Sequence, residues 1–329
     1  MPQPTFVSHA QNGEDVVLHR ALRTVGQGRY VEVGANHPES LSITRGFYDL
    51  GWSGVTIDPV AAYADLHGEQ RPRDTFVRAA VTDAEIDEVE FHEFPGTGLS
   101  TLDAEVADRH RATGRESVTT RVPARRLDDV LESAGLRGQD IHFLVVDTEG
   151  AEAQVLASID LTRWRPWVMV VESTAPLDTA QTHGSWEPRL LEQGYEFCLF
   201  DGLSRFYVAR EHADRLRESL SYPACPLDEY VLATDLRTQE RIDALVASRD
   251  QLTSELVRWR GEAVARWSAA TVAASAAPAD DGAAQQEAQR LREEVAQLHR
   301  ELAAVRATVS WRVTAPLRAV RGVTRGAAR

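Results

Sequence analysis

The sequence predicts an α/β domain built on a doubly wound, seven-stranded and mostly parallel sheet, and two observations support this fold class. Five short apolar runs, at residues 30–33, 55–58, 76–81, 143–147 and 168–172, alternate with stretches of helical character. Two further β-rich runs, at 195–201 and 205–209, are separated by Gly202-Leu203-Ser204 and predict a hairpin. We therefore expect a parallel sheet that an antiparallel pair closes at one edge.

The predicted strands are nearly continuous apolar runs, as expected where helices cover both faces of a parallel sheet. Helices are expected between them at residues 42–50, 61–70, 127–134 and 151–159. A chain of 329 residues accommodates one such domain of about 200 to 250 residues and an appendage. We place the globular domain at residues 1–232.

Beyond residue 232 the composition shifts to Ala, Arg, Glu and Gln. This shift predicts a helical segment at 233–272, an Ala-rich linker at 273–284 and a short coiled coil at 285–309. Apolar residues in the coiled-coil segment alternate spacings of four and three: Leu291, Val295, Leu298, Leu302, Val305 and Val309. The seam predicts either a homodimer or a single amphipathic helix that packs on the domain.

The last segment, residues 310–329, holds five Arg and no acid, although the whole chain carries a formal charge of −14. Such a basic amphipathic tail suits an anionic surface, which predicts a peripheral membrane contact. The acidic body excludes a nucleic-acid-coating protein and favours a small or sugar-like substrate.

Cysteine content and hydropathy indicate the cellular compartment. Cys198 and Cys225 are too few for a disulfide framework and lack zinc-ligand spacing. The first fifteen residues contain no signal-peptide pattern, and no apolar run approaches the length of about 20 residues that spans a bilayer. We expect a cytoplasmic protein, with the tail at the inner membrane face.

A cofactor loop is predicted where the first strand, ending in Glu32 and Val33, runs into Gly34. Glycine lets the backbone turn sharply near a ligand, and the Glu32 carboxylate suits a cationic sulfonium. The Gly-x-Gly-x-x-Gly pattern of dinucleotide sites is absent, because Ala35, Asn36 and His37 follow Gly34. The loop therefore disfavours a nicotinamide cofactor.

Further acids follow the other strands, at the sheet edge where such folds bind cofactors. Asp58 is placed to accept two ribose hydroxyl groups, and Asp83 to meet an adenine amino group. Asp147 ends the fourth strand and is followed by Glu149. The alternative for each of these acids is a helix N-cap or a solvated turn.

The chain resembles the FkbM-type family of S-adenosylmethionine-dependent methyltransferases over residues 8–210. The resemblance rests on eight blocks in order: AQNGED at 10–15, VEVGAN at 31–36, SIT at 42–44, GWSG at 51–54, IDP at 57–59, GLST at 98–101, LDDVL at 127–131 and DTEGAE at 147–152. It implies a Rossmann-like methyltransferase sheet and S-adenosylmethionine as cofactor, with Glu32, Gly34 and Asp58 as binding residues. Together with the strand-end acids, the expected cofactor set is Glu32, Gly34, Asn36, Asp58, Asp83 and Asp147. Where family members often carry Lys, two residues before Asp147, this chain has Val145.

Methyl transfer from a sulfonium is a direct displacement, so the enzyme aligns the acceptor oxygen and accepts its proton. The candidate catalytic residues are Asp147, Glu149, Glu172 and His183. Two carboxylates in one pocket either raise one pKa or hold a divalent metal, and the sequence leaves the metal requirement open. Glu172 has the alternative of capping a turn, and His183 that of a surface histidine.

These observations predict an O-methyltransferase acting on a hydroxyl of a glycan or glycosylated metabolite. The segment 310–318 resembles a short motif of bacterial proteins that assemble surface polysaccharides, which implies lipid-linked acceptors. Two alternatives stay open: an enzyme that tailors a polyketide or other small natural product, and a catalytically silent methyltransferase-like module that recruits partners.

Overall fold

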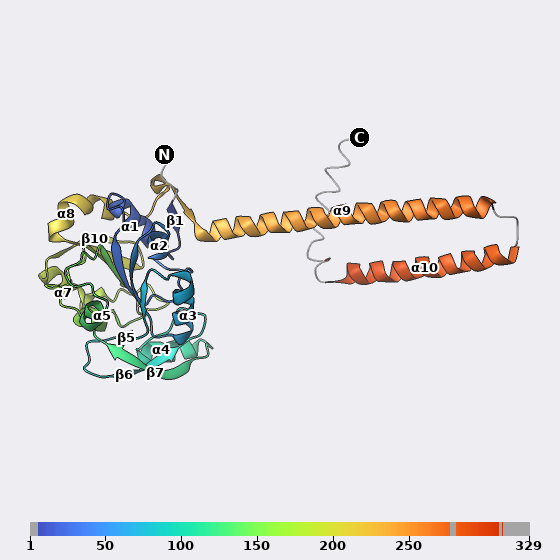
Figure 1. The fold of residues 1–329 in the computed structure, drawn as a ribbon. Coiled ribbons are helices and arrows are strands. Elements are labelled where there is room, and N and C mark those ends of the chain that lie inside the picture. The colour runs from blue at the N-terminus through green and yellow to red at the C-terminus, as the bar shows by residue number, and fades with distance from the viewer. Residues whose placement is uncertain (1–5, 277–280, 309–310, 312–329) are drawn as a thin grey trace. The chain divides into compact units, whose positions relative to one another are not determined.

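The computed structural model describes residues 6–276, 281–308 and 311. The chain divides into two compact units, Met1–Arg241 and Ile242–Arg329. The first unit is a mixed α/β domain (Figure 1), which confirms the α/β class predicted from the sequence but not the doubly wound arrangement.

A seven-stranded, mostly parallel sheet forms the centre of this domain. Its order is β10-β11-β9-β8-β2-β3-β4, and β11 runs antiparallel to both β9 and β10. The hairpin predicted after the fifth apolar run is therefore confirmed. The strands are β2 (Arg29–Val33), β3 (Ser53–Ile57), β4 (Thr75–Val77), β8 (Phe143–Val146), β9 (Val168–Glu172), β10 (Tyr195–Phe200) and β11 (Ser204–Ala209).

Successive side chains of the central strands enter two different hydrophobic clusters, because a strand turns alternate residues to opposite faces of the sheet. In β8, Leu144 and Val146 join one cluster, whereas Phe143 and Val145 join the other. The first cluster includes residues of α5, α6 and α7, and the second includes residues of α1, α2 and α8. These helices are α1 (Glu14–Leu22), α2 (Arg45–Asp49), α5 (Leu127–Ser133), α6 (Glu152–Ala157), α7 (Glu187–Glu192) and α8 (Arg210–Leu216).

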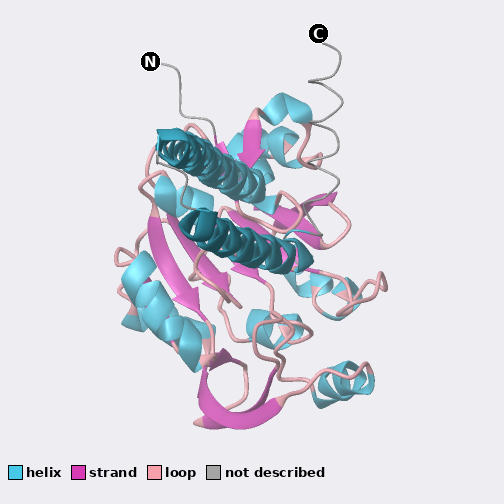
Figure 2. Ribbon diagram, turned by 90° about the vertical axis from the view of Figure 1, so that its right-hand side faces the viewer, coloured by secondary structure: helices cyan, strands magenta, loops and turns pink. Residues whose placement is uncertain are grey.

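The third predicted run, at 76–81, is two strands rather than one. The chain leaves the main sheet after β4, and β5 (Ala80–Val81) pairs instead with β7 (Val118–Arg125), which also pairs with β6 (Glu88–Glu93). Figure 2 shows the strongly curved strands of this second sheet in magenta at the lower end of the domain. α3 (Ala61–Gln70) precedes β4, and α4 (Ala104–Ala112) lies between β6 and β7 in the sequence.

A third, two-stranded sheet joins the two ends of the domain. β1 (Phe6–Ser8) pairs in parallel with β12 (Tyr230–Leu232). Nearby, Arg20 of α1 forms an ion pair with Asp228 at 2.9 Å, and both side chains are buried. Three short 3₁₀ helices complete the domain: η1 (His183–Ser185), η2 (Glu218–Leu220) and η3 (Pro226–Asp228).

The C-terminal part contains two long helices, α9 (Ala233–Ala276) and α10 (Asp281–Ala307). They enter the expected linker from both sides, and residues 277–280 lie outside the described residues. On α10 the seam residues Leu291, Val295, Leu298, Leu302 and Val305 are exposed. Val309 and the tail at 310–329, apart from the exposed Trp311, lie outside the described residues, so the coiled coil and the membrane contact stay predictions. Among the described helices, none is both long and apolar enough to cross a bilayer.

Candidate active site

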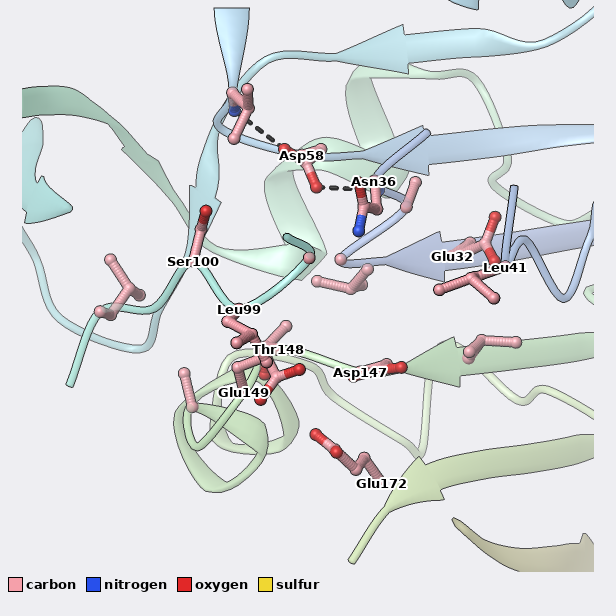
Figure 3. Close-up of a pocket in the computed structure, with 18 of the residues that line it drawn as sticks. Glu32, Asn36, Leu41, Asp58, Leu99, Ser100, Asp147, Thr148, Glu149 and Glu172 are labelled. Atoms are coloured by element: carbon pink, nitrogen blue, oxygen red, sulfur yellow. Dashed lines mark hydrogen bonds between the residues drawn. The ribbon is translucent and has the colours of Figure 1, made fainter. Parts of the chain in front are cut away.

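A cavity of about 820 Å³ lies at the carboxyl ends of β2, β3, β8 and β9. The parallel strands end at this edge of the sheet, and a turn follows each of them. The turns leave space for a ligand. Figure 3 shows the strand-end residues that project into this space. Seven of the predicted site residues line this cavity: Glu32, Gly34, Asn36, Asp58, Asp147, Glu149 and Glu172.

Gly34 follows β2 and lies against Asp147, the residue that follows β8. It has a φ of 83°, in the left-handed region, and a Cβ placed on it would lie 1.6 Å from the backbone oxygen of Asp147. A side chain is therefore excluded by the neighbouring strand end as well as by the backbone conformation. Glycine at this position brings the cofactor loop against the acid that ends β8.

Asp58 is held by backbone amides on both sides of its carboxylate. Oδ2 accepts a hydrogen bond from the amide of Asn36 at 2.9 Å, and Oδ1 accepts one from the amide of Val60 at 2.9 Å. Burial raises the pKa of Asp58 to about 6, and these amide hydrogen bonds oppose the shift. A carboxylate has about four acceptor positions, so two remain to receive hydroxyl donors from a ligand.

Glu32 is buried within a network of donors. Its carboxylate accepts from the amide of Ile43 and the hydroxyl of Thr44, and Arg71 lies 3.9 Å away. Burial raises the pKa of Glu32 to about 7, although Arg71 and Thr44 oppose this shift. Glu32 thus fixes the segment before α2 while it lines the cavity at the end of β2.

Asp147, Glu149 and Glu172 form an acidic cluster, with one carboxylate oxygen of each within 4.8 Å of the others. β8 and β9 are neighbours in the sheet, so Asp147, after β8, and Glu172, at the end of β9, meet at the same edge. Burial raises the pKa of Glu172 well above its ordinary value, and the adjacent Asp147 and Glu149 charges add to the shift. Burial also raises the pKa of Asp147.

Glu149 reaches this cluster from a strained turn. Its φ is 53°, in the left-handed region that a bulky side chain seldom adopts. Burial, with Asp147 and Glu152 nearby, raises the pKa of Glu149 to about 8. Glu152 stabilises the turn, because its Oε1 accepts from the amides of Thr148 and Gly150 at 3.1 and 3.0 Å. Sequence reasoning quoted Glu152 as part of a motif but missed this supporting role.

The rim of the cavity comes from segments outside the central parallel strands. Gln11 and Glu14 line it together with Leu203 and Ser204 of the hairpin turn and residues 177–179. Glu14 is 3% exposed, and its Oε2 accepts from the amide of Asn12. In the sequence, Gln11 and Glu14 are identified only as part of the block at 10–15, because their place at the cavity depends on how α1 packs.

Two predicted site residues are corrections, because neither lines the cavity. Asp83 is exposed, since the chain turns away with β5 into the second sheet, and the Asp83 carbonyl accepts from Arg126. His183 lies in η1, where its ring approaches Glu187 at 3.7 Å and packs edge-on against Trp186. Neither residue is therefore placed to touch a ligand in this cavity.

A comparison with known protein families assigns the domain that contains this cavity. A family model described as the methyltransferase FkbM domain matches residues 32–197, from the end of β2 into β10. The chain belongs to this family. No curated protein matches the sequence. The match spans the cofactor loop, Asp58 and all three members of the acidic cluster.

This FkbM-family chain is thus a methyltransferase, and the family in general uses S-adenosylmethionine. The residues present fit that cofactor: Asp58 has free acceptor positions, and apolar residues line the cavity beside it. Val145, which replaces the frequent lysine, also lines the cavity. At this position the cavity of this chain has an apolar side chain instead of an ammonium group.

Proposed function

We propose that this chain is an S-adenosylmethionine-dependent O-methyltransferase that acts on a hydroxyl of a glycan or glycosylated metabolite. One observation carries the proposal. A single cavity contains Asp58, a backbone-held carboxylate with free acceptor positions, and the acidic cluster of Asp147, Glu149 and Glu172. The first group suits a ribose and the second suits the proton of an acceptor hydroxyl.

The cofactor end is assigned by the chemistry of the lining. Beside Asp58 the cavity wall is made of apolar groups that suit a flat purine ring: Val60, Ala79, Val81 and Phe91. Glu32 and Gly34 lie at the end of β2, where the methionine part of the cofactor would extend. S-adenosylmethionine supplies an electrophilic methyl group when it is bound.

Glu149 is the best-suited proton acceptor. A general base is most effective when its pKa lies near the working pH, and burial raises the pKa of Glu149 to about 8. Deprotonated Glu149 would therefore be a stronger base than an exposed carboxylate. Asp147 and Glu172 would orient the acceptor oxygen beside it, with Glu152 holding the turn.

The rim supports a polar acceptor over an apolar one. Gln11, Asp178, Thr179 and Ser204 provide hydrogen-bonding groups there. A polyhydroxylated acceptor can use several such groups at once, whereas an apolar polyketide would leave them without partners. This lining is the reason to place the glycan or glycosylated metabolite ahead of the small natural product.

The test is calorimetric titration of the full chain with S-adenosylhomocysteine, the demethylated product. Asp58→Asn should weaken binding at least tenfold, because an amide accepts ribose hydroxyls less strongly than a carboxylate. Asp65→Asn, an exposed substitution on α3, is the matched control and should bind normally. Absence of binding by the unaltered chain would refute the proposal and favour the silent-module alternative.

The acceptor class requires a second experiment. Glycans and metabolites from a strain that lacks this protein should each be incubated with the enzyme and labelled S-adenosylmethionine. Mass analysis should detect a gain of one methyl group on a sugar hydroxyl. Methyl gain only on a non-glycosylated natural product would establish the alternative acceptor class.

A further inference from the structure

We propose that Asp147, Glu149 and Glu172 bind one divalent cation of the magnesium or manganese type at the acceptor end of the cavity. This inference rests on the proposed function, since the cation would hold the acceptor hydroxyl of that reaction. It adds a metal site, and therefore a metal requirement, to an enzyme that the carboxylates alone could also serve.

The geometry of the donors suits a hard cation. The three residues offer oxygen donors only, and magnesium and manganese prefer such ligands to nitrogen or sulfur. Their donor atoms lie within 4.8 Å of one another. Oxygens on opposite sides of a magnesium ion are separated by about 4.2 Å, twice the usual metal–oxygen distance. Small side-chain rotations would therefore bring the three oxygens around one ion.

An independent observation indicates a missing partner. Oε2 of Glu149 and Oε2 of Glu172 are both buried and have no hydrogen-bond donor among the described residues. Figure 3 shows both carboxylates directed toward the space beside Asp147. A buried carboxylate oxygen without a donor lowers the stability of the fold. Two such oxygens, on separate chain segments of one cavity, therefore indicate a ligand that the two carboxylates share.

Glu32 provides the contrast within the same cavity. It is also buried, yet its carboxylate accepts from Thr44 and Ile43 and lies 3.9 Å from Arg71. Among the described residues, no Arg or Lys forms an ion pair with the acidic cluster, and Oε2 of Glu149 and of Glu172 lacks a donor. A dication would reduce the formal charge of three ionised carboxylates from −3 to −1.

A proton shared by two carboxylates is the competing explanation. It would join the carboxylates of Asp147 and Glu172, which meet at one edge of the sheet. It leaves the two buried Oε2 atoms unpartnered, and it gives Glu149 no role in the cluster. A bound cation accounts for all three side chains together.

The cation would act on the acceptor rather than on the cofactor. A hydroxyl that coordinates a dication loses its proton more readily, as metal-bound water does. The magnesium type of ion also keeps positions for non-protein oxygens, so an acceptor can enter its coordination shell. One oxygen of each carboxylate would then hold the ion, and the second oxygen of Glu149 would accept the proton of the coordinated hydroxyl.

The experiment uses the full chain, stripped with a chelator and titrated with Mn²⁺ alone while electron paramagnetic resonance reports free ion. One ion should bind per chain, and Glu149→Gln and Glu172→Gln should each weaken binding at least tenfold. Glu192→Gln, which removes an exposed carboxylate on α7, is the matched control and should leave Mn²⁺ binding unchanged.

A second measurement covers the case in which the cluster variants fail to fold. Mn²⁺ added to the unaltered chain should broaden the proton resonances of bound S-adenosylhomocysteine, because the cluster and Asp58 share one cavity. Unchanged resonances would place the ion elsewhere and overturn the inference.

The two proposals can fail separately. If S-adenosylhomocysteine binds but Mn²⁺ does not, or if Mn²⁺ binds both cluster variants normally, the metal site is wrong and the proposed function stands. If Mn²⁺ binds at the cluster but S-adenosylhomocysteine does not bind, the metal site stands and the proposed function is wrong.

Discussion

Replacing Glu14 by Gln should stabilise the domain at neutral pH and leave its stability nearly unchanged in mild acid. Burial, together with the nearby charge of Asp201, raises the pKa of Glu14 from 4.5 to about 8. The folded protein therefore holds a proton at Glu14 that the unfolded chain releases. Stability from this group is fully present below pH 4.5 and is lost as the pH rises toward 8.

The magnitude follows from the two pKa values. One pH unit within this window corresponds to about 1.4 kcal/mol, so the Glu14 contribution falls by about 3 kcal/mol between about pH 5 and pH 7.5. Gln at this position keeps the oxygen that accepts from the amide of Asn12. The other buried acids act equally on both proteins, and their effects cancel in the comparison.

The assay is urea unfolding of the metal-free and cofactor-free chain, followed by fluorescence of buried tryptophans such as Trp52 and Trp164. The difference in free energy of unfolding between Glu14→Gln and the unaltered chain should grow by about 3 kcal/mol across that pH range. Glu192→Gln, at an exposed position, should show no such growth. A difference that does not change with pH would mean that Glu14 is ionised in the folded domain.

Four further predictions concern the site and the C-terminal part. Gly34→Ala should lower the thermal midpoint in scanning calorimetry far more than Gly96→Ala. Both glycines have a left-handed φ, but only a Cβ at position 34 would meet another backbone segment. Equal decreases in the thermal midpoint would refute this close approach. Glu149→Gln should reduce turnover on the order of 100-fold while S-adenosylhomocysteine affinity stays normal, and normal turnover would remove Glu149 from the chemistry. The full chain should sediment with anionic vesicles at low salt and release at high salt, and a chain ending at residue 277 should not. Leu298→Asp should halve the mass in light scattering if the α10 seam pairs two copies, and an unchanged mass would contradict that pairing.

The main sheet could be predicted because its strands are buried on both faces. Runs such as Phe143–Val146 are apolar throughout, so they are visible without knowledge of their neighbours. The second sheet carries no such signal, since Val118–Arg125 contains Thr and Arg and is largely exposed at its first residues. β1 and β12 have three residues each, and their pairing depends on contacts more than 200 positions apart.

The candidate site was predictable where it depends on strand ends and not where it depends on loops. Asp58, Asp147 and Glu172 follow buried strands, whose carboxyl ends meet at one edge in a parallel sheet. Asp83 was misplaced because the chain leaves that edge two residues after β4. His183 was misplaced because the path of the loop after β9 is set by tertiary packing.

The pairing of β1 with β12 sets an order for assembly during synthesis. Among the described residues, β1 has no strand partner except β12, so it stays unpaired until residues 230–232 have left the ribosome. The strands that carry Gly34 and Asp58 pair with each other much earlier in the chain. Gln11 and Glu14 follow β1 directly, so a strand beside these cavity residues stays without its partner until then. A chain arrested before residue 230 would therefore present this strand unpaired, although β2 and β3 could already pair.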